Sequence, residues 1–232
     1  MILKASEDAK MEKKAVIFDL DGTLLDTLED LCDSVNVAMR KFSSPERALG
    51  EIRQFVGNGA ADLIDKSLKD GKSNPEYESA LAFFKGYYAE HADIKTHPYD
   101  GMIDLLLRLR NLGICTAVVT NKPDEASSAL CKKHFGSLLD YSVGDKNGLL
   151  RKPAPDKVFD VMKRLECDKA VFVGDSETDV LTAINADMEC LCVTWGFRDR
   201  DQLESAGGKI FCDDAESLWN EVMRGLGMEN EG

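Results

Sequence analysis

The chain has 232 residues, about one and a half times an ordinary domain of ~150 residues, which favours one large domain or a core that carries an insertion. Apolar residues make up 44% of the chain and charged residues 31%, a composition that excludes disordered, collagen-like and coiled-coil chains. Lys and Arg number 29 against 42 Asp and Glu, and the net charge of −13 disfavours binding to nucleic acid or to an anionic membrane surface.

The cellular setting follows from what the sequence lacks. No stretch approaches the ~20 apolar residues of a membrane helix, and residues 1–12 form a polar leader without the apolar stretch of a signal peptide. The seven cysteines include no Cys-x-x-Cys pair, and the three histidines have no metal-binding spacing. We expect a cytoplasmic monomer or homodimer with no nucleic-acid or membrane partner.

Short apolar runs recur along the chain and alternate with segments of helical periodicity. Buried strands that alternate with helices indicate a parallel sheet covered on both faces. The predicted fold class is therefore α/β, with a Rossmann-like parallel sheet. The predicted strands are 14–18, 114–119, 138–143, 170–174 and 191–194, of which the third has the weakest pattern.

The interval between the first two strands is too long for a simple crossover. About 95 residues separate Phe18 from Ile114, whereas a crossover between parallel strands needs about a dozen. We therefore predict an inserted all-helical cap domain at 25–92, with the α/β core formed by 13–24 and 93–232.

Several helix boundaries can be placed inside this interval. Asp26 with Glu29 resembles a capping box, and Ser44 and Asn74 each precede a proline, a further helix-start signal. Residues 101–111 are predicted to form the helix that returns to the core, ended by Gly113.

Two carboxylates follow the first predicted strand. Asp19 and Asp21 are spaced by two, so both side chains can leave the backbone toward one pocket before Gly22 turns the chain. A calcium loop of the EF-hand type is excluded, because its sixth position would need glycine where Leu24 stands and because a strand precedes it. Ligands of open parallel sheets bind beyond the carboxyl ends of the strands, so this pair is a candidate site.

A second acidic pair follows the fourth predicted strand. Asp175 and Asp179 would meet Asp19 and Asp21 at the same edge, and two like charges ~4 Å apart repel by about 4 kcal/mol at an effective dielectric of ~20. Hard carboxylate oxygens favour Mg²⁺, which shares a substrate phosphate readily. Because Ser176 and Asp179 fit a capping box, we place Asp175 as the metal ligand and Asp179 behind it.

Groups suited to a phosphate lie near the same edge. Thr120 follows the second strand, and Pro123 can occupy the first turn of the next helix, so a hydroxyl and free amides face the edge. Lys152, in RKPAPD, approaches on a stretch stiffened by prolines. Taken alone, Thr120 is also compatible with a strand end and Lys152 with a solvated surface.

The predicted cap offers one anion-binding candidate. Gly57, Asn58 and Gly59 precede a segment with apolar periodicity, so their amides can bind the far end of a small anion, although an ordinary turn fits the same residues. The sequence does not indicate which basic residues of the cap, if any, face the cleft: Arg40, Arg47, Arg53, Lys66 and Lys69.

Four motifs together resemble the haloacid dehalogenase superfamily, specifically its phosphatases with a helical cap inserted after the first strand. They are FDLDGTLLDT, VVTNK, RKPAPD and VGDSETD, in this order, and the resemblance covers Lys13 to Trp219. VGNG at 56–59 and TNKP at 120–123, which includes Asn121, are similar to the phosphoglycolate phosphatase branch.

The resemblance implies roles for particular residues. Asp19 would be the nucleophile that forms an aspartyl-phosphate, and Asp21 the general acid and then base. Thr120 and Lys152 would hold the phosphoryl group. Mg²⁺ would be bound by Asp19, the backbone carbonyl of Asp21 and Asp175. Asn121 and the 57–59 loop would contact substrate.

The expected activity is Mg²⁺-dependent hydrolysis of a small phosphorylated metabolite, with 2-phosphoglycolate as the best guess. A sugar-phosphate phosphomutase, a pyrophosphatase and a nucleotidase remain open as alternatives within the same fold. A non-catalytic protein that binds a phosphorylated metabolite is disfavoured by the complete set of motifs, and a dehalogenase has no use for Asp21 or for the metal-binding carboxylate.

Overall fold

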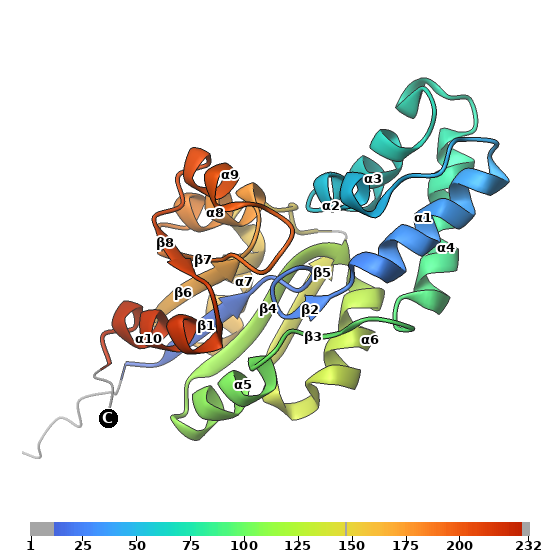
Figure 1. The fold of residues 1–232 in the computed structure, drawn as a ribbon. Coiled ribbons are helices and arrows are strands. Elements are labelled where there is room, and N and C mark those ends of the chain that lie inside the picture. Colours follow the sequence, from blue (N-terminus) through green and yellow to red (C-terminus); the bar gives the residue numbers. More distant parts are fainter. Residues whose placement is uncertain (1–11, 147, 229–232) are drawn as a thin grey trace, which may run out of the picture.

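The computed structural model describes residues 12–146 and 148–228 and contains a parallel six-stranded sheet in the order β5-β4-β1-β6-β7-β8 (Figure 1). All neighbouring strands run parallel, with β1 at the centre between β4 and β6. The predicted α/β fold class is confirmed. The strands are β1 (Lys14–Phe18), β4 (Cys115–Pro123), β5 (Tyr141–Asp145), β6 (Lys169–Gly174), β7 (Cys190–Val193) and β8 (Ile210–Cys212).

Helices cover both faces of the sheet, as alternating side chains of β1 require. Val16 and Phe18 pack with helices α5, α6 and α10, whereas Ile17 packs on the opposite face with α7 and α8. None of the helices in the described residues is both long and apolar enough to cross a membrane. The helices of the core are α5 (Met102–Asn111), α6 (Asp124–His134), α7 (Asp156–Leu165), α8 (Glu177–Asn185), α9 (Arg200–Ser205) and α10 (Ala215–Gly225).

The strands of this sheet differ from the sequence prediction mainly at three places. Strand β4 continues past the predicted end at 119 to Pro123, so Thr120 lies within the strand rather than after it. The predicted strand 138–143 begins only at Tyr141, because Gly136–Leu138 forms a 3-10 turn first. The edge strand β8 was not predicted, because a run of three residues carries no periodicity.

A layer of helices stands beyond the carboxyl edge of the sheet (Figure 1). The antiparallel pair β2 (Leu25–Asp26) and β3 (His97–Pro98) marks where the chain leaves the core and returns. This layer, which we call the cap, has an apolar core of its own that includes Val35, Ile64 and Phe84. The division at 25 and 92 stays a prediction. The helices of the cap are α1 (Leu28–Lys41), α2 (Leu49–Phe55), α3 (Ala60–Ser67), the 3-10 turn Gly71–Ser73 and α4 (Tyr77–His91).

The helix starts in the cap are close to the predicted ones, with small shifts. Asp26 Oδ1 accepts from Leu28 N at 3.1 Å, but the residue that precedes the first turn is Thr27. Asn74 Oδ1 accepts from Glu76 N at 2.9 Å, just before α4. After Ser44 the chain continues without a helix as far as α2.

Asp30 ties the exit of the cap to its entry. It lies in the first turn of α1, is 2% exposed, and accepts from the backbone N–H groups of Ile94, Lys95 and Thr96 and from the Thr96 hydroxyl at 2.8–3.1 Å. A buried carboxylate satisfied by so many donors fixes the segment before β3 against α1. The leader predicted at 1–12 falls outside the described residues except for residue 12.

Substitution of Asp30 is expected to destabilise this joint. Asp30→Ala leaves three backbone N–H groups without their acceptor, and the free energy of unfolding should fall by about 2 kcal/mol in urea denaturation. Asp33→Ala is the matched control, because Asp33 lies one turn further along α1 and makes only an exposed ion pair with Lys95, which solvent screens. Equal effects of the two substitutions would contradict the role given to Asp30.

Candidate active site

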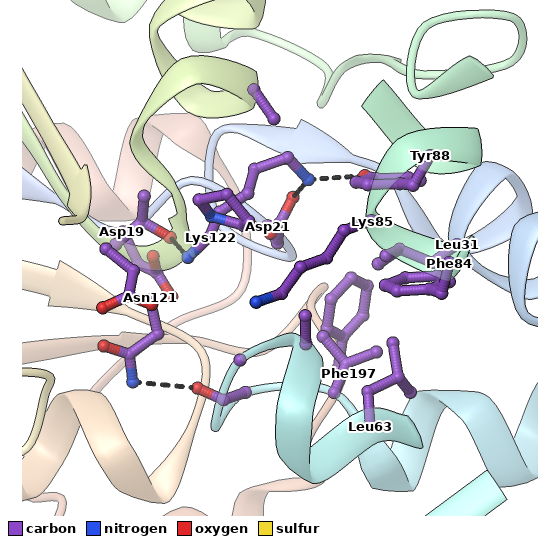
Figure 2. A pocket seen from close by; sticks show the side chains of 18 of the residues that line it. Asp19, Asp21, Leu31, Leu63, Phe84, Lys85, Tyr88, Asn121, Lys122 and Phe197 are labelled. Atoms are coloured by element: carbon purple, nitrogen blue, oxygen red, sulfur yellow. Dashed lines mark hydrogen bonds and ion pairs between the residues drawn. The ribbon is translucent and has the colours of Figure 1, made fainter. Parts of the chain in front are cut away.

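A cavity of about 280 Å³ lies between the carboxyl edge of the sheet and the cap (Figure 2). The core contributes polar groups to it, among them Asp19, Thr120 and Asp175. The cap and the loop after β7 contribute mainly apolar walls. The position agrees with the rule that open parallel sheets bind ligands beyond their carboxyl ends. The apolar lining consists chiefly of Leu31, Val56, Leu63, Phe84 and Phe197.

The structure brings together three of the four predicted carboxylates as a buried cluster. One oxygen each of Asp19, Asp175 and Asp179 lies within 4.8 Å of the others. Asp21 is partly exposed and lines the cavity beside them. The convergence follows from topology, since β1 and β6 are neighbours and both carry an aspartate directly after their last residue.

The three carboxylates of this cluster carry more negative charge than Lys152 alone can compensate. Burial raises the pKa of Asp19 from its ordinary value near 3.8 to about 6, although Lys152 Nζ lies 2.9 Å from Oδ1 and acts in the opposite direction. Burial, followed by the charges of Asp179 and Asp19, raises the pKa of Asp175 well above its ordinary range. Asp175 accepts from Phe197 N at 2.7 Å and from the Thr23 hydroxyl at 3.0 Å. These donors fix the carboxylate without neutralising it.

Glycines make room for the carboxylates. At Gly22, whose φ is +83°, a Cβ would stand 2.3 Å from Asp175 Oδ2. At Gly174 a Cβ would stand 2.3 Å from the Cβ of Asp179, and this close approach, rather than the sharp turn that the sequence suggested, explains the glycine, because its φ is not positive. Any side chain at either position would displace a carboxylate of the cluster.

Asp179 differs from the other two because its oxygens already have partners. Oδ1 lies 2.6 Å from Lys152 Nζ, and Oδ2 accepts from Ser176 N at 3.0 Å and from the Ser176 hydroxyl at 2.6 Å. The side chain thus stabilises the start of α8 and holds Lys152. Asp19 and Asp175 are the carboxylates whose chemistry fits a hard divalent cation, with Asp179 behind them.

The amide of Asn121 positions Lys152. Asn121 Oδ1 accepts from Lys152 N at 2.9 Å, and Nδ2 donates to Lys152 O at 3.0 Å. The same Nδ2 also approaches Gly57 O at 3.3 Å. Asn121 lines the cavity, so its role in substrate binding stays a prediction, and its amide also bonds to the backbone of the core and the cap.

Thr120 lines the cavity and is anchored from behind. Its hydroxyl accepts from Lys122 N at 3.3 Å, and its carbonyl accepts from the buried Lys157 Nζ at 2.8 Å. Burial, with a further contribution from Lys152, lowers the pKa of Lys157 to about 8. Lys157 was not a sequence candidate, since a lysine inside a helical pattern gives no sign of burial.

Lys122 and Tyr88 are further groups that the sequence did not single out. Lys122 Nζ lies 2.8 Å from Asp21 Oδ1 and 2.5 Å from the hydroxyl of Tyr88 on α4 (Figure 2). All three residues line the cavity. The sequence signal available for Lys122 was its place in the VVTNK and TNKP motifs, two residues after Thr120.

The loop at 57–59 meets the cavity in part. Gly57 and Gly59 line it, whereas Asn58 is not among the lining residues, and its Oδ1 accepts from the Thr178 hydroxyl at 2.9 Å. Gly59, with φ +87°, directly precedes α3, as the predicted apolar periodicity requires. Asn58 therefore connects the cap to α8 of the core.

The loop after β7 connects the same two layers. The guanidinium of Arg198, 5% exposed, donates to the carbonyls of Arg53 and Val56 at 2.7 Å and of Gln54 at 3.3 Å. These carbonyls lie at the C-terminal end of α2, where positive charge is favourable. Its neighbour Phe197 donates to Asp175, so one short loop contacts both the carboxylate cluster and the cap.

Among the basic residues of the described cap, only Lys85 of α4 lines the cavity. Figure 2 shows its side chain directed into the cavity from the cap. The five basic residues considered from the sequence are absent from the lining. Arg40, for example, pairs with Glu46 at 2.8 Å, and Lys66 pairs with Asp62 at 2.7 Å.

Comparison with known proteins decides the family. A sequence profile described as haloacid dehalogenase-like hydrolase matches residues 16–193. The chain belongs to the haloacid dehalogenase-like hydrolase family. It is 33% identical to phosphoglycolate phosphatase 1 of Pseudomonas aeruginosa over 221 residues, which cover 92% of this chain and 78% of that protein.

Solved structures of the family agree. One from Lactobacillus delbrueckii subsp. bulgaricus, whose description names phosphoglycolate phosphatase as its expected activity, superposes with a TM-score of 0.86 at 35% identity and covers 91% of this chain and 99% of its own. CbbY from Rhodobacter sphaeroides, solved with phosphate, shares the fold with a TM-score of 0.76 at 22% identity, covering 94% of this chain and 100% of its own. The predicted family and enzyme class, a phosphatase, are confirmed.

The repulsion in the cluster predicts how stability depends on metal and pH. The raised pKa values of Asp19 and Asp175 mean that the metal-free folded protein binds protons more tightly than the unfolded chain. The free energy of unfolding therefore falls as pH rises, and the contribution of Asp19 to this fall lies between about pH 4 and pH 6. At neutral pH, Mg²⁺ should raise the melting temperature, by about 2–4 °C for each kcal/mol that it contributes.

The variant Asp175→Asn distinguishes stabilisation by Mg²⁺ bound at the carboxylate cluster from stabilisation by ions bound elsewhere on the protein. In EDTA at neutral pH the variant should melt above the unsubstituted protein, because one buried charge is removed, and Mg²⁺ should then stabilise it little. Asp104→Asn, on the surface of α5, should behave like the unsubstituted protein. A full response of Asp175→Asn to Mg²⁺ in thermal melts would contradict the assignment of Asp175.

Proposed function

We propose that this enzyme is a Mg²⁺-dependent phosphomonoester hydrolase of the cytoplasm whose substrate is 2-phosphoglycolate. The observation that carries the proposal is the meeting of Asp19 and Asp21 at one cavity that is closed on its far side by the cap, with Lys152 Nζ 2.9 Å from Asp19 Oδ1 behind it. A nucleophile and a proton donor thus face one small ligand, and a cation for phosphate lies next to the nucleophile. The names of its relatives support the substrate.

In the first step, an oxygen of the ionised Asp19 attacks phosphorus and forms an aspartyl-phosphate. The bond between phosphorus and the ester oxygen breaks, its electron pair goes to that oxygen, and the proton of Asp21 neutralises the departing alkoxide. A carboxylate needs no base for this attack. Lys152 and the Thr120 hydroxyl bind the phosphoryl oxygens as charge shifts onto them.

In the second step, water attacks the phosphorus of the aspartyl-phosphate. Asp21, now a carboxylate, takes a proton from this water, the bond from phosphorus to the Asp19 oxygen breaks, and its electrons return to the carboxylate. Phosphate and the original enzyme result. The apolar walls of the cavity exclude further water during the first step.

The residues present fit a bound Mg²⁺. The carboxylates of Asp19 and Asp175 and the backbone carbonyl of Asp21 would hold it, in agreement with the uncompensated charge of the cluster. When bound, Mg²⁺ supplies positive charge that lets a phosphate dianion enter an acidic site.

The cap favours a substrate with a second negative charge. Among the described lining residues, Lys85 is the only basic group without a carboxylate partner, since Lys122 is paired with Asp21. The ammonium group of Lys85 is therefore available to a group beyond the phosphate, and the carboxylate of 2-phosphoglycolate provides one.

Removal of the nucleophile should abolish turnover. Asp19→Asn is expected to lower phosphate release from 2-phosphoglycolate with Mg²⁺ by about 10⁴-fold or more, because a neutral amide does not attack phosphorus. Asp104→Asn serves as the control. Phosphate release by purified Asp19→Asn at the unsubstituted rate would overturn the mechanism, and preference for a sugar phosphate, nucleotide or pyrophosphate in the same assay would overturn the substrate.

Lys85→Met should impair substrate selection more than chemistry. The KM for 2-phosphoglycolate should rise about 10- to 100-fold, as expected for loss of a charged hydrogen bond of about 1.5–3 kcal/mol. The KM for 2-hydroxyethyl phosphate, which lacks the carboxylate, should stay within about twofold. Lys69→Met, on the exposed surface of the cap, is the matched control. An equal change for both substrates would show that Lys85 does not read the carboxylate.

A further inference from the structure

Asp21, Lys122 and Tyr88 form a buried chain of contacts from the core to the cap (Figure 2). Asp21 follows β1, Lys122 lies at the end of β4, and Tyr88 belongs to α4. The ammonium of Lys122, in a side chain only 2% exposed, donates to Asp21 Oδ1 at 2.8 Å and to the Tyr88 hydroxyl at 2.5 Å. It also lies 4.5 Å from the centre of the Tyr88 ring.

The contact restrains one oxygen of Asp21 and leaves the other free. Lys122 holds Oδ1, while Oδ2 has no hydrogen-bond partner among the described residues, and Asp21 lines the cavity. A carboxyl group held at one oxygen has a fixed rotamer, so its second oxygen keeps a constant direction. Such restraint suits a group that must meet a departing oxygen on one side of the substrate.

Tyr88 in turn restrains Lys122. Its ring stacks on Phe84 with centroids 5.6 Å apart, within the apolar core of the cap. Burial raises the pKa of Tyr88 to about 12, so the phenol stays neutral and its oxygen accepts from the ammonium. A lysine side chain has four rotatable bonds, and two fixed acceptors define where its ammonium lies. The second of these acceptors comes from the cap alone.

We propose that Tyr88, acting through Lys122, positions Asp21 for proton transfer to the leaving group, an inference that rests on the proposed phosphatase mechanism. As the phosphorus to ester-oxygen bond breaks, its electron pair stays on that oxygen, and the proton moves there from Asp21 Oδ2. Lys122 and Tyr88 are positioning residues that form no bond to the substrate. The cap thereby contributes to the chemical step as well as to substrate selection.

Leaving groups of different basicity distinguish positioning from mere support of the fold. The alkoxide that leaves from 2-phosphoglycolate needs a proton, whereas 4-nitrophenolate leaves without one. The value of kcat/KM reports the step in which the leaving group departs. Tyr88→Phe keeps the ring and removes only the hydroxyl. With Mg²⁺, it should lower kcat/KM about 10-fold for 2-phosphoglycolate and less than about threefold for 4-nitrophenyl phosphate.

Two further variants complete the test. Lys122→Met should show the same selectivity with a larger loss, about 100-fold for 2-phosphoglycolate. Tyr87→Phe is the matched control, because Tyr87 is adjacent on α4 but stacks on His91 and does not line the cavity. It should leave both substrates unaffected.

The outcomes separate the two proposals. Equal losses for both substrates in Tyr88→Phe, or no loss for either, would overturn the positioning role while leaving the phosphatase mechanism intact. Absence of activity toward both phosphates in the unsubstituted enzyme with Mg²⁺ would overturn the proposed function itself, and the inference with it.

Discussion

Repulsion between buried carboxylates is the constraint on which the site is built. Asp19, Asp175 and Asp179 are almost wholly removed from water, and one lysine, Lys152, faces two of them. Burial of charge without full compensation is costly, and the fold tolerates it because neighbouring strands deliver the side chains and glycines leave space for them. The site is therefore poised for a cation and an anion together, which is the requirement of phosphoryl transfer.

The site also requires protection from water, because electrostatic interactions in a charged cleft weaken when the cleft is open to solvent, and the cap provides this protection. Its wall beside the carboxylates is mostly apolar, and its polar contributions are few and localised. Tyr88 contacts the core through Lys122, and Lys85 lines the cavity without a carboxylate partner in the part of the chain that the structure describes. In the proposed mechanism, helix α4 would thus contact both the proton donor, through Tyr88, and the far end of the ligand, through Lys85.

The features that could be predicted from the sequence are those that depend on local residue patterns. The central strand before Asp19, the acidic pair near Asp175, and the capping role of Asp179 all depend on residues close together in the chain. The roles of Lys122 and Tyr88 could not be predicted because they depend on contacts between residues 34 and 101 positions apart, which a single sequence does not reveal. Lys85 could not be predicted because the sequence does not show which basic residues of the cap line the cavity. Edge strand β8 could not be predicted because three residues show no period, and the hydrogen bonds from the Asn121 amide to the backbone of Lys152 could not be predicted because they join distant parts of the chain.

Consecutive residues of the loop after β7 bind different partners: Phe197 donates to Asp175, and Arg198 donates to the end of α2. Thermodynamic reciprocity applies to such an arrangement. If a bound ion stabilised the contact between this loop and α2 by a given free energy, that contact would strengthen ion binding by the same free energy. If the proposed Mg²⁺ binds at Asp175, opening of the helical layer and release of the ion would therefore be linked equilibria, joined by the peptide unit between Phe197 and Arg198.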